Sequence, residues 1–283
     1  MYADDTQLYF SCPPVQAEID RWIARTEACI SDIRRWMQES YLKLNDNKTQ
    51  FLLLGSRQQL AKFEVLHVHI GTTSVSPVEK SRNLGVIFDS NMTMESQVSN
   101  CVKLAYHSLR NLRAIRKYLT QKAAEQLVHA FVTSRIDCCN SLLYGLPKCQ
   151  LQKLQRVQNS AARLVTNTRK YSHITPILKS LHWLPVEQRL KYKVLLITFR
   201  ALMFSSPQYI SSLITIYKPS RSGLRSSNDF SLVVPKSTRT WGDRTFASAA
   251  PRLWNRLPKS IQRSETVDNF KNKLKTQLMK ETF

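Results

Sequence analysis

The sequence predicts an α+β fold that is mostly helical, in which β-hairpins and one long helix come first and a larger helical region follows. After residue 92, apolar residues recur at three- and four-residue steps, the period of an amphipathic helix. Glycine is scarce, with 6 in 283 residues, and this composition favours helices over a glycine-rich sandwich or barrel. Apolar residues make up 42% of the chain, which is enough to form cores and argues against wholesale disorder.

The first ten residues carry two adjacent acids, Asp4 and Asp5, between short runs that favour β-strand. Tyr2 precedes the pair, and Leu8-Tyr9-Phe10 follows it. Neighbouring residues of a regular strand point to opposite faces, so both acids can serve one site only at a tight turn. A hairpin with Asp-Asp at its tip suits Mg²⁺, a hard cation that prefers oxygen ligands. The alternative is a polar turn that joins two strands and binds nothing.

The rest of the first 90 residues predicts one long helix and several strands. The helix is expected from about Val15 to Met37, because apolar residues recur there along one stripe. Asn and Asp at 45–47 favour a turn, and strands are expected at 49–54, 65–70 and 82–88. A helix of this length with one apolar stripe would cover the back of a small sheet.

Residues beyond 92 predict a series of helices. Thr93 is expected to cap the first helix, which continues to Leu119, and Thr120 is expected to cap the second. Further helices are expected at 151–165, 174–181, 186–204 and 266–279. The helix at 186–204 is apolar round most of its circumference and should therefore be central in a second core.

Two stretches between these helices lack helical periodicity. Residues 218–245 are rich in Ser, Arg, Thr and Pro and predict an extended basic loop with one short strand at 232–234. This loop could bind single-stranded RNA or serve as a tether. Pro251 to Pro258 is expected to be a turn. The predicted organisation has five parts, at 1–90, 91–170, 171–217, 218–245 and 246–283.

The net charge of +22 is unevenly placed along the chain. Residues 1–88 hold 10 Lys+Arg and 10 Asp+Glu, whereas residues 89–283 hold the other 32 and 10. A basic surplus of this size predicts a polyanionic partner, and nucleic acid is the one expected. The basic residues of the first predicted helix beyond residue 92 are candidates for that contact: Lys103, Arg110, Arg113, Arg116 and Lys117. The alternative is a helix bundle with a solvated basic exterior.

The cysteines and the hydropathy pattern exclude several classes of protein. The six cysteines show no C-x-x-C pair and no regular spacing, which predicts a reduced, intracellular protein without structural zinc. No apolar run approaches the roughly 20 residues that a membrane span needs, and no signal peptide precedes the acidic pair. The expected partners therefore include no membrane, and the sequence does not favour nucleus over cytoplasm.

Several segments resemble one protein family in order and spacing. Tyr2-Ala3-Asp4-Asp5 resembles the Y/F-A-D-D box of reverse transcriptases, in the form used by non-LTR (LINE-type) retrotransposons. The segments at 42–45 and 47–49 are similar to the palm segment after that box, and 83–89 resembles the Leu-Gly hairpin that grips the primer. Residues 252–258 are similar to the tails of Jockey/CR1-like elements. The resemblance covers nearly the whole chain, but its mechanistic content ends near residue 89.

This resemblance implies a polymerase that copies RNA into DNA with two Mg²⁺ ions. Asp4 would be the bridging carboxylate and Asp5 a more peripheral member of the metal box. Lys48 would protonate or screen the pyrophosphate, although a turn lysine in water explains it equally well. Leu84 and Gly85 would position the primer end. The parts at 1–90 and 91–170 would be a partial palm and a helical thumb, with an RNA template and DNA primer, or an RNA/DNA hybrid, as partner.

The family's site also needs a third aspartate and fingers, which precede the Asp-Asp box in the family. This chain starts at that box, so it is expected to be a fragment that holds Mg²⁺ weakly or not at all and does not polymerise by itself. The alternative function is that of a non-enzymatic, basic helical nucleic-acid-binding protein. In that case residues 92–283 would bind the nucleic acid and the palm would be vestigial.

Overall fold

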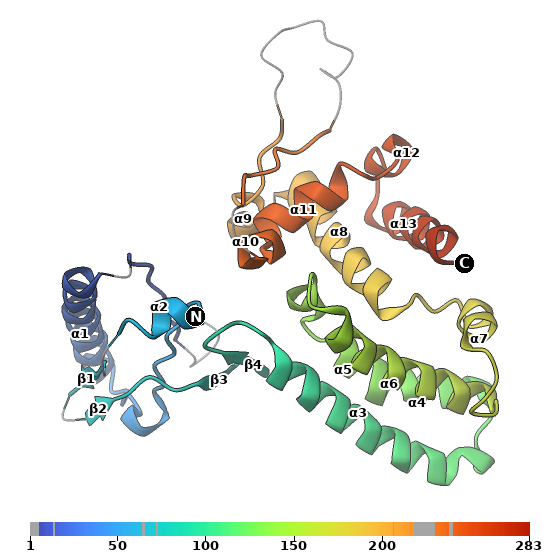
Figure 1. Cartoon of the computed structure of the whole chain (residues 1–283), viewed down its shortest axis with the longest axis horizontal. Coiled ribbons are helices and arrows are strands. Elements are labelled where there is room, and N and C mark those ends of the chain that lie inside the picture. The colour runs from blue at the N-terminus through green and yellow to red at the C-terminus, as the bar shows by residue number, and fades with distance from the viewer. Residues whose placement is uncertain are drawn as a thin grey trace, which may run out of the picture. The chain divides into compact units, whose positions relative to one another are not determined.

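The computed structural model describes residues 6–13, 15–63, 66–71, 73–205, 207–217, 230–237 and 240–283 (Figure 1). The chain divides into two compact units, Met1–Ser96 and Gln97–Phe283. The described residues are mostly helical and contain two small antiparallel sheets, so the predicted α+β, mostly helical class is confirmed.

The first unit consists of one long helix, two hairpins and two short helical turns. Its elements are α1 (Gln16–Glu39), η1 (Asp46–Lys48), α2 (Arg57–Leu60), β1 (Val68–Ile70), β2 (Thr73–Val75), β3 (Lys80–Asn83) and β4 (Val86–Asp89). β1 pairs with β2, and β3 pairs with β4 from Lys80 opposite Asp89 to Asn83 opposite Val86. The predicted long helix is present as α1, and it is joined to β1 by a 2.7 Å hydrogen bond from the His69 N–H to Glu27 Oε1.

The strand predictions for this unit were partly wrong. The strand expected at 49–54 is reduced to one bridge between Phe51 and Pro77, because proline has no N–H with which to extend the ladder. The strand expected at 82–88 is instead the β3–β4 hairpin, which turns at residues 84–85. Leu8–Phe10 forms no strand, and the Phe10 ring lies edge-on to Trp22 with 5.6 Å between ring centroids.

The described residues of the second unit form helices and connecting turns. Its elements are α3 (Glu95–Ile115, whose first residues close the first unit), η2 (Arg116–Tyr118), α4 (Gln121–Val128), η3 (His129–Thr133), α5 (Ser134–Asp137), η4 (Asn140–Leu143), α6 (Lys148–Thr166), α7 (Ile174–Ser180), α8 (Val186–Phe204), α9 (Gln208–Ser211), α10 (Thr240–Arg244), α11 (Phe246–Trp254), α12 (Lys259–Gln262) and α13 (Val267–Thr282). The Thr120 side chain caps α4 by accepting a 3.2 Å hydrogen bond from the Ala123 N–H, as predicted.

The helical segments α4, η3 and α5 follow one another without a break, and η3 is a π-helix. The buried residues of this segment recur every four positions: Ala124, Val128, Val132 and Ile136. α4 packs along α6 (Figure 1). A π-turn widens the helix locally, and here it coincides with the middle of this buried row.

A second core surrounds α8, which packs against α11 and α13. The predicted helix at 186–204 is therefore confirmed. Phe199 of α8 stacks on Phe270 of α13 with 4.2 Å between ring centroids, and Trp254 of α11 lies against the same ring at 6.0 Å. These three aromatic side chains are fully buried and supply much of the apolar area of this core.

Two predictions near this core were wrong. Pro251 lies inside α11 rather than in a turn, because the burial of Ala250, Leu253 and Trp254 outweighs the cost of a proline in a helix. Residues 240–244, expected to belong to an extended loop, form α10. In the expected strand at 232–234, only Leu232 pairs, in one antiparallel bridge to Ile216. Residues 218–229 lie outside the described part of the chain.

Candidate nucleic-acid interface

The predicted metal ligands Asp4 and Asp5 lie outside the residues that the structure describes. Within the described ranges, no cluster of three or more His, Cys, Asp or Glu side chains could hold a metal ion. Asp89, the acid that ends β4, is buried and accepts hydrogen bonds from the Thr93 N–H, the Thr93 hydroxyl and the Met94 N–H, at 2.8–3.1 Å. Its carboxylate is therefore engaged in the turn that leads into α3.

Lys48 is the last residue of η1, and its side chain is exposed. Its neighbour in that turn, Asp46, is held by Arg34 through a 2.6 Å ion pair that joins the turn to α1. This ion pair fixes the turn that carries Lys48 while leaving the lysine itself in solvent. Such a placement fits a turn lysine and also leaves its amine accessible to a phosphate.

Leu84 and Gly85 form the two-residue turn of the β3–β4 hairpin. Both have positive φ, 45° and 84°, as a type I′ turn requires. A Cβ built on Gly85 would meet nothing within 4 Å, so glycine is needed there for its backbone angle and not for space. Leucine is strained at positive φ, and its side chain is 56% exposed at the tip of the hairpin. A strained, exposed apolar residue at a turn tip is consistent with a contact role.

Replacement of Leu84 by Asn should stabilise the hairpin by about 1 kcal/mol, because Asn tolerates the left-handed region and Asn-Gly is the preferred type I′ pair. Urea unfolding followed by circular dichroism measures the change. Leu54→Asn is the matched control, since Leu54 is 51% exposed in the same unit and has no positive φ. A gain no larger than that of the control would contradict the strain assigned to Leu84.

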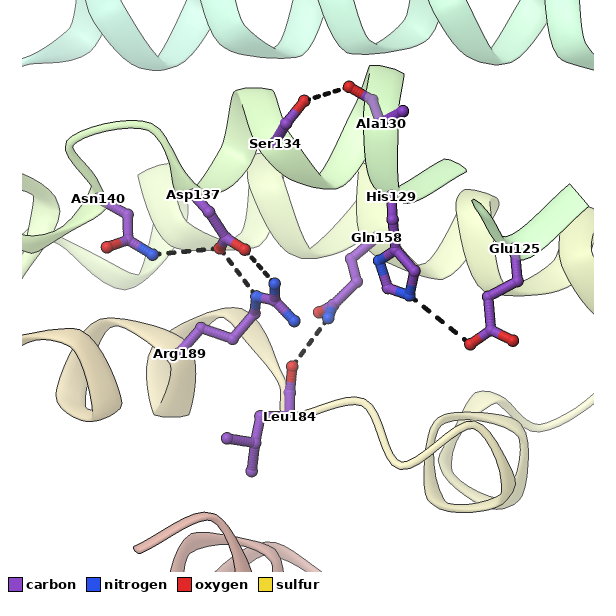
Figure 2. A network of polar contacts seen from close by, with 9 residues as sticks. All are labelled: Glu125, His129, Ala130, Ser134, Asp137, Asn140, Gln158, Leu184 and Arg189. Carbon is purple, nitrogen blue, oxygen red and sulfur yellow. Dashed lines mark hydrogen bonds and ion pairs between the residues drawn. The ribbon is translucent and has the colours of Figure 1, made fainter. Parts of the chain in front are cut away.

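The charge of residues 97–186 is strongly uneven, since they contain 14 Lys+Arg and only two carboxylates, Glu125 and Asp137. Both carboxylates have polar partners within the fold (Figure 2). Glu125 Oε1 accepts a hydrogen bond from Trp183 Nε1 at 3.3 Å and lies 3.6 Å from His129 Nε2. Asp137 Oδ1 accepts hydrogen bonds from Arg189 Nε at 2.9 Å and from Asn140 Nδ2 at 3.1 Å. Glu125 belongs to α4 and Asp137 to α5, so neither acid is on α3.

The exposed cations of α3 form a stripe opposite its buried face. Ala105, Leu109 and Leu112 point into the core. Lys103, Arg110 and Arg113 are exposed, and at 100° per residue they fall within one arc of the helix. Lys117 in η2 is also exposed. The distance along the helix from residue 103 to residue 113 is about 15 Å. The fold therefore places four of the five predicted basic residues on the surface.

Arg116, the fifth, has a different role. It is half-buried, and its guanidinium donates to the carbonyls of Leu164 at 2.7 Å, Val165 at 2.9 Å and Leu119 at 2.8 Å. Leu164 and Val165 belong to the last turn of α6, whose carbonyls have no partners within that helix. A cation at a helix C-terminus is also favoured by the helix dipole. Arg116 thus joins the ends of α3 and α6.

Sequence reasoning missed a second basic segment, at the loop between α6 and α7. Arg169 and Lys170 are exposed there beside Tyr171. The signal was present in the sequence, as two cations and an aromatic residue directly after a predicted helix. Arg163, which belongs to α6, holds this loop by donating to the Ser172 carbonyl at 3.2 Å.

Two thiols of this unit, those of Cys101 and Cys139, do not favour nucleophilic chemistry. Burial raises the pKa of the Cys101 thiol and of the Cys139 thiol, and the nearby Cys138 raises both further. The thiolate is the nucleophilic form, so a raised pKa makes each of these cysteines less reactive at neutral pH.

None of the helices among the described residues is both long and apolar enough to cross a membrane. A scan against protein-family models finds no match, and searches of curated proteins and of solved structures find none either.

Proposed function

We propose that the second unit, Gln97–Phe283, binds nucleic acid, and that its ligand is an RNA/DNA hybrid duplex contacted along α3. The observation that supports this function is the charge of residues 97–186, which contain 14 Lys+Arg and only two carboxylates. Both carboxylates already bind other side chains, Glu125 that of Trp183 and Asp137 that of Arg189. A surface of uncompensated cations is stabilised by a ligand with regularly spaced negative charge, and binding releases the counterions of that ligand.

The shape of the surface favours a duplex. The α3 stripe is rigid and about 15 Å long between Lys103 and Arg113, and phosphates along one strand are spaced by a few ångströms of helix rise. Several phosphates can therefore meet the stripe at once. An amphipathic helix binds an anionic membrane best when its apolar face is exposed. The apolar face of α3 is buried.

The proposed parent of this chain is a non-LTR retrotransposon reverse transcriptase. The resemblance of residues 2–5 and 83–89 supports this proposal, as does the exposed Leu84 at the hairpin tip, where a primer contact is expected. In such a parent, Asp4 and Asp5 would bind Mg²⁺, and the second unit would hold the template–primer duplex. A protein that joins this chain to fingers and a third aspartate should make DNA on an RNA template, and Asp4→Asn should abolish that synthesis.

The binding proposal is tested by titrating the full chain into a fluorescent, blunt-ended RNA/DNA hybrid at several salt concentrations. A linear fall of log K with log salt, with a slope of about −0.9 for each phosphate contact, is expected. A slope of about −3 would match the three exposed cations of α3, Lys103, Arg110 and Arg113. Absence of binding at low salt, or binding that is equally tight for phosphatidylserine vesicles, would contradict the proposal.

A second candidate is a nucleic-acid-binding protein without polymerase activity. It is favoured by the engagement of Asp89 and Asp137, since neither carboxylate is free to complete a metal site. Residues 97–283 alone should then bind the hybrid as tightly as the full chain does. A large loss on removal of the first unit would favour the polymerase parent, in which Leu84 and Gly85 contact the primer.

A further inference from the structure

The chain contains the tripeptide Arg-Lys-Tyr twice, at 116–118 and at 169–171. Both copies form a turn closed by a backbone hydrogen bond from the fourth residue to the first. These bonds run from the Leu119 N–H to the Arg116 carbonyl and from the Ser172 N–H to the Arg169 carbonyl, each at 3.2 Å. The tyrosine is the third residue of each turn, and Tyr118 and Tyr171 are 76% and 92% exposed. The two copies thus share their sequence, the hydrogen bond that closes the turn and an exposed tyrosine.

The backbone beside each tyrosine is held by an arginine side chain. The carbonyl of Leu119, directly after Tyr118, accepts from Arg116 Nη1 at 2.8 Å. The carbonyl of Ser172, directly after Tyr171, accepts from Arg163 Nη2 at 3.2 Å. Each ring is therefore presented to solvent from a fixed turn, and less conformational entropy is lost when a ligand covers it.

The two turns lie at the same end of the second unit. Arg116 of the first turn donates to the carbonyls of the last turn of α6, and the second turn follows α6 directly. In Figure 1 the end of α3 and the end of α6 lie together beside α7. The Lys117 amine is 4.8 Å from the centroid of the Tyr118 ring, and Arg169 and Lys170 are exposed beside Tyr171. Each ring thus has cations next to it.

We propose that the two Arg-Lys-Tyr turns bind unpaired nucleotides, with one base stacked on Tyr118 and one on Tyr171. Lys117, Arg169 and Lys170 contact the phosphates of the same strand. Aromatic rings interleaved with cations suit single strands, because every base has a face that can stack and the paired bases of a duplex do not expose theirs. The inference rests on the proposed function, and it adds the single-stranded segment that adjoins the duplex to the ligand of this unit.

The test compares three probes bound by the full chain: a blunt RNA/DNA hybrid, the same hybrid with a single-stranded RNA overhang, and that overhang made abasic. The wild-type chain should bind the overhang probe most tightly. Tyr118→Leu and Tyr171→Leu should each weaken binding of that probe about fivefold and leave the blunt hybrid unaffected. Tyr209→Leu is the matched control, since Tyr209 is 71% exposed on α9 and lies outside both turns.

The abasic probe separates stacking from charge. The abasic overhang keeps the phosphates and lacks the bases. The wild-type chain should therefore bind it with about the same affinity as the double variant Tyr118→Leu/Tyr171→Leu binds the intact overhang. A double variant that keeps the full preference for the intact overhang would overturn the proposal, leave hybrid binding along α3 standing and point to a protein partner for the tyrosines. If the chain binds the overhang in a tyrosine-dependent way but does not bind the blunt hybrid, base stacking on the two turns is supported. The proposal that α3 binds a duplex is then refuted.

Discussion

The triple variant Lys103→Ala/Arg110→Ala/Arg113→Ala should bind an RNA/DNA hybrid about 100-fold more weakly than the wild-type chain at about 0.1 M salt. All three side chains are exposed on one arc of α3, and no ion pair joins any of them to an acid in the described residues. Each phosphate contact that is lost should reduce the salt slope by about 0.9, so three should reduce it by about 2.7. Fluorescence anisotropy over a range of salt concentrations measures both quantities.

A matched triple in the first unit controls for net charge. Arg25→Ala/Lys43→Ala/Lys62→Ala removes the same three charges from exposed positions. It should change the affinity little, because the first unit carries 10 Lys+Arg and 12 Asp+Glu and has no basic surplus. If both triples weaken binding equally, the attraction is due to the overall charge of the protein and not to the α3 stripe.

Arg116→Ala should lower the free energy of unfolding of the second unit by about 3 kcal/mol. The side chain donates three hydrogen bonds to carbonyls, and a buried hydrogen bond from a charged group contributes about 1.5–3 kcal/mol to stability. Part of that loss is recovered by water, since Arg116 is only half-buried. Arg116→Lys should rescue little, because an ammonium group lacks the planar fork that reaches three separate carbonyls. Urea unfolding measures the change.

Arg113→Ala, three residues earlier, should affect binding and not stability. Arg113 is exposed, so its loss should change the free energy of unfolding by no more than about 0.5 kcal/mol while weakening hybrid binding. Arg116→Ala should weaken folding first and binding only as far as the fold is lost. An Arg116→Ala protein as stable as the wild-type chain would show that the carbonyls of α6 are satisfied equally well by water.

Local patterns predicted those elements whose burial follows one regular period. The helix at 186–204 was predicted with its bounds because nearly every face of it is apolar and Pro185 fixes its start. The long helix α1 and the Thr120 cap were likewise predicted from the apolar stripe and from a hydroxyl placed before it. These features depend on neighbours in sequence, so a single sequence is sufficient to find them.

Features decided by distant contacts were missed. Arg116 occupies the same basic stretch as Arg110 and Arg113, and only the position of the α6 C-terminus distinguishes it from them. Pro251 was predicted to begin a turn, although burial against the α8 core holds it in α11. The lost strand at 49–54 depended on Pro77, a partner more than 20 residues away. The acidic pair Asp4-Asp5 lies outside the described residues, so its metal role stays a prediction.

The row of buried residues through the π-helix implies an unusual sensitivity to changes in chain length. A straight α-helix rotates by about 40° over each four-residue step, so a row with that period would wind about 120° round the helix between Ala124 and Ile136. The extra width of η3 takes up part of this rotation within the row. Insertion of a single residue beside the π-turn should therefore turn the segment after it by about 100°, whereas deletion of the exposed Ala130 within the π-turn should close it to a regular α-turn. Related sequences should accordingly tolerate substitutions of exposed residues between 124 and 136 far better than insertions.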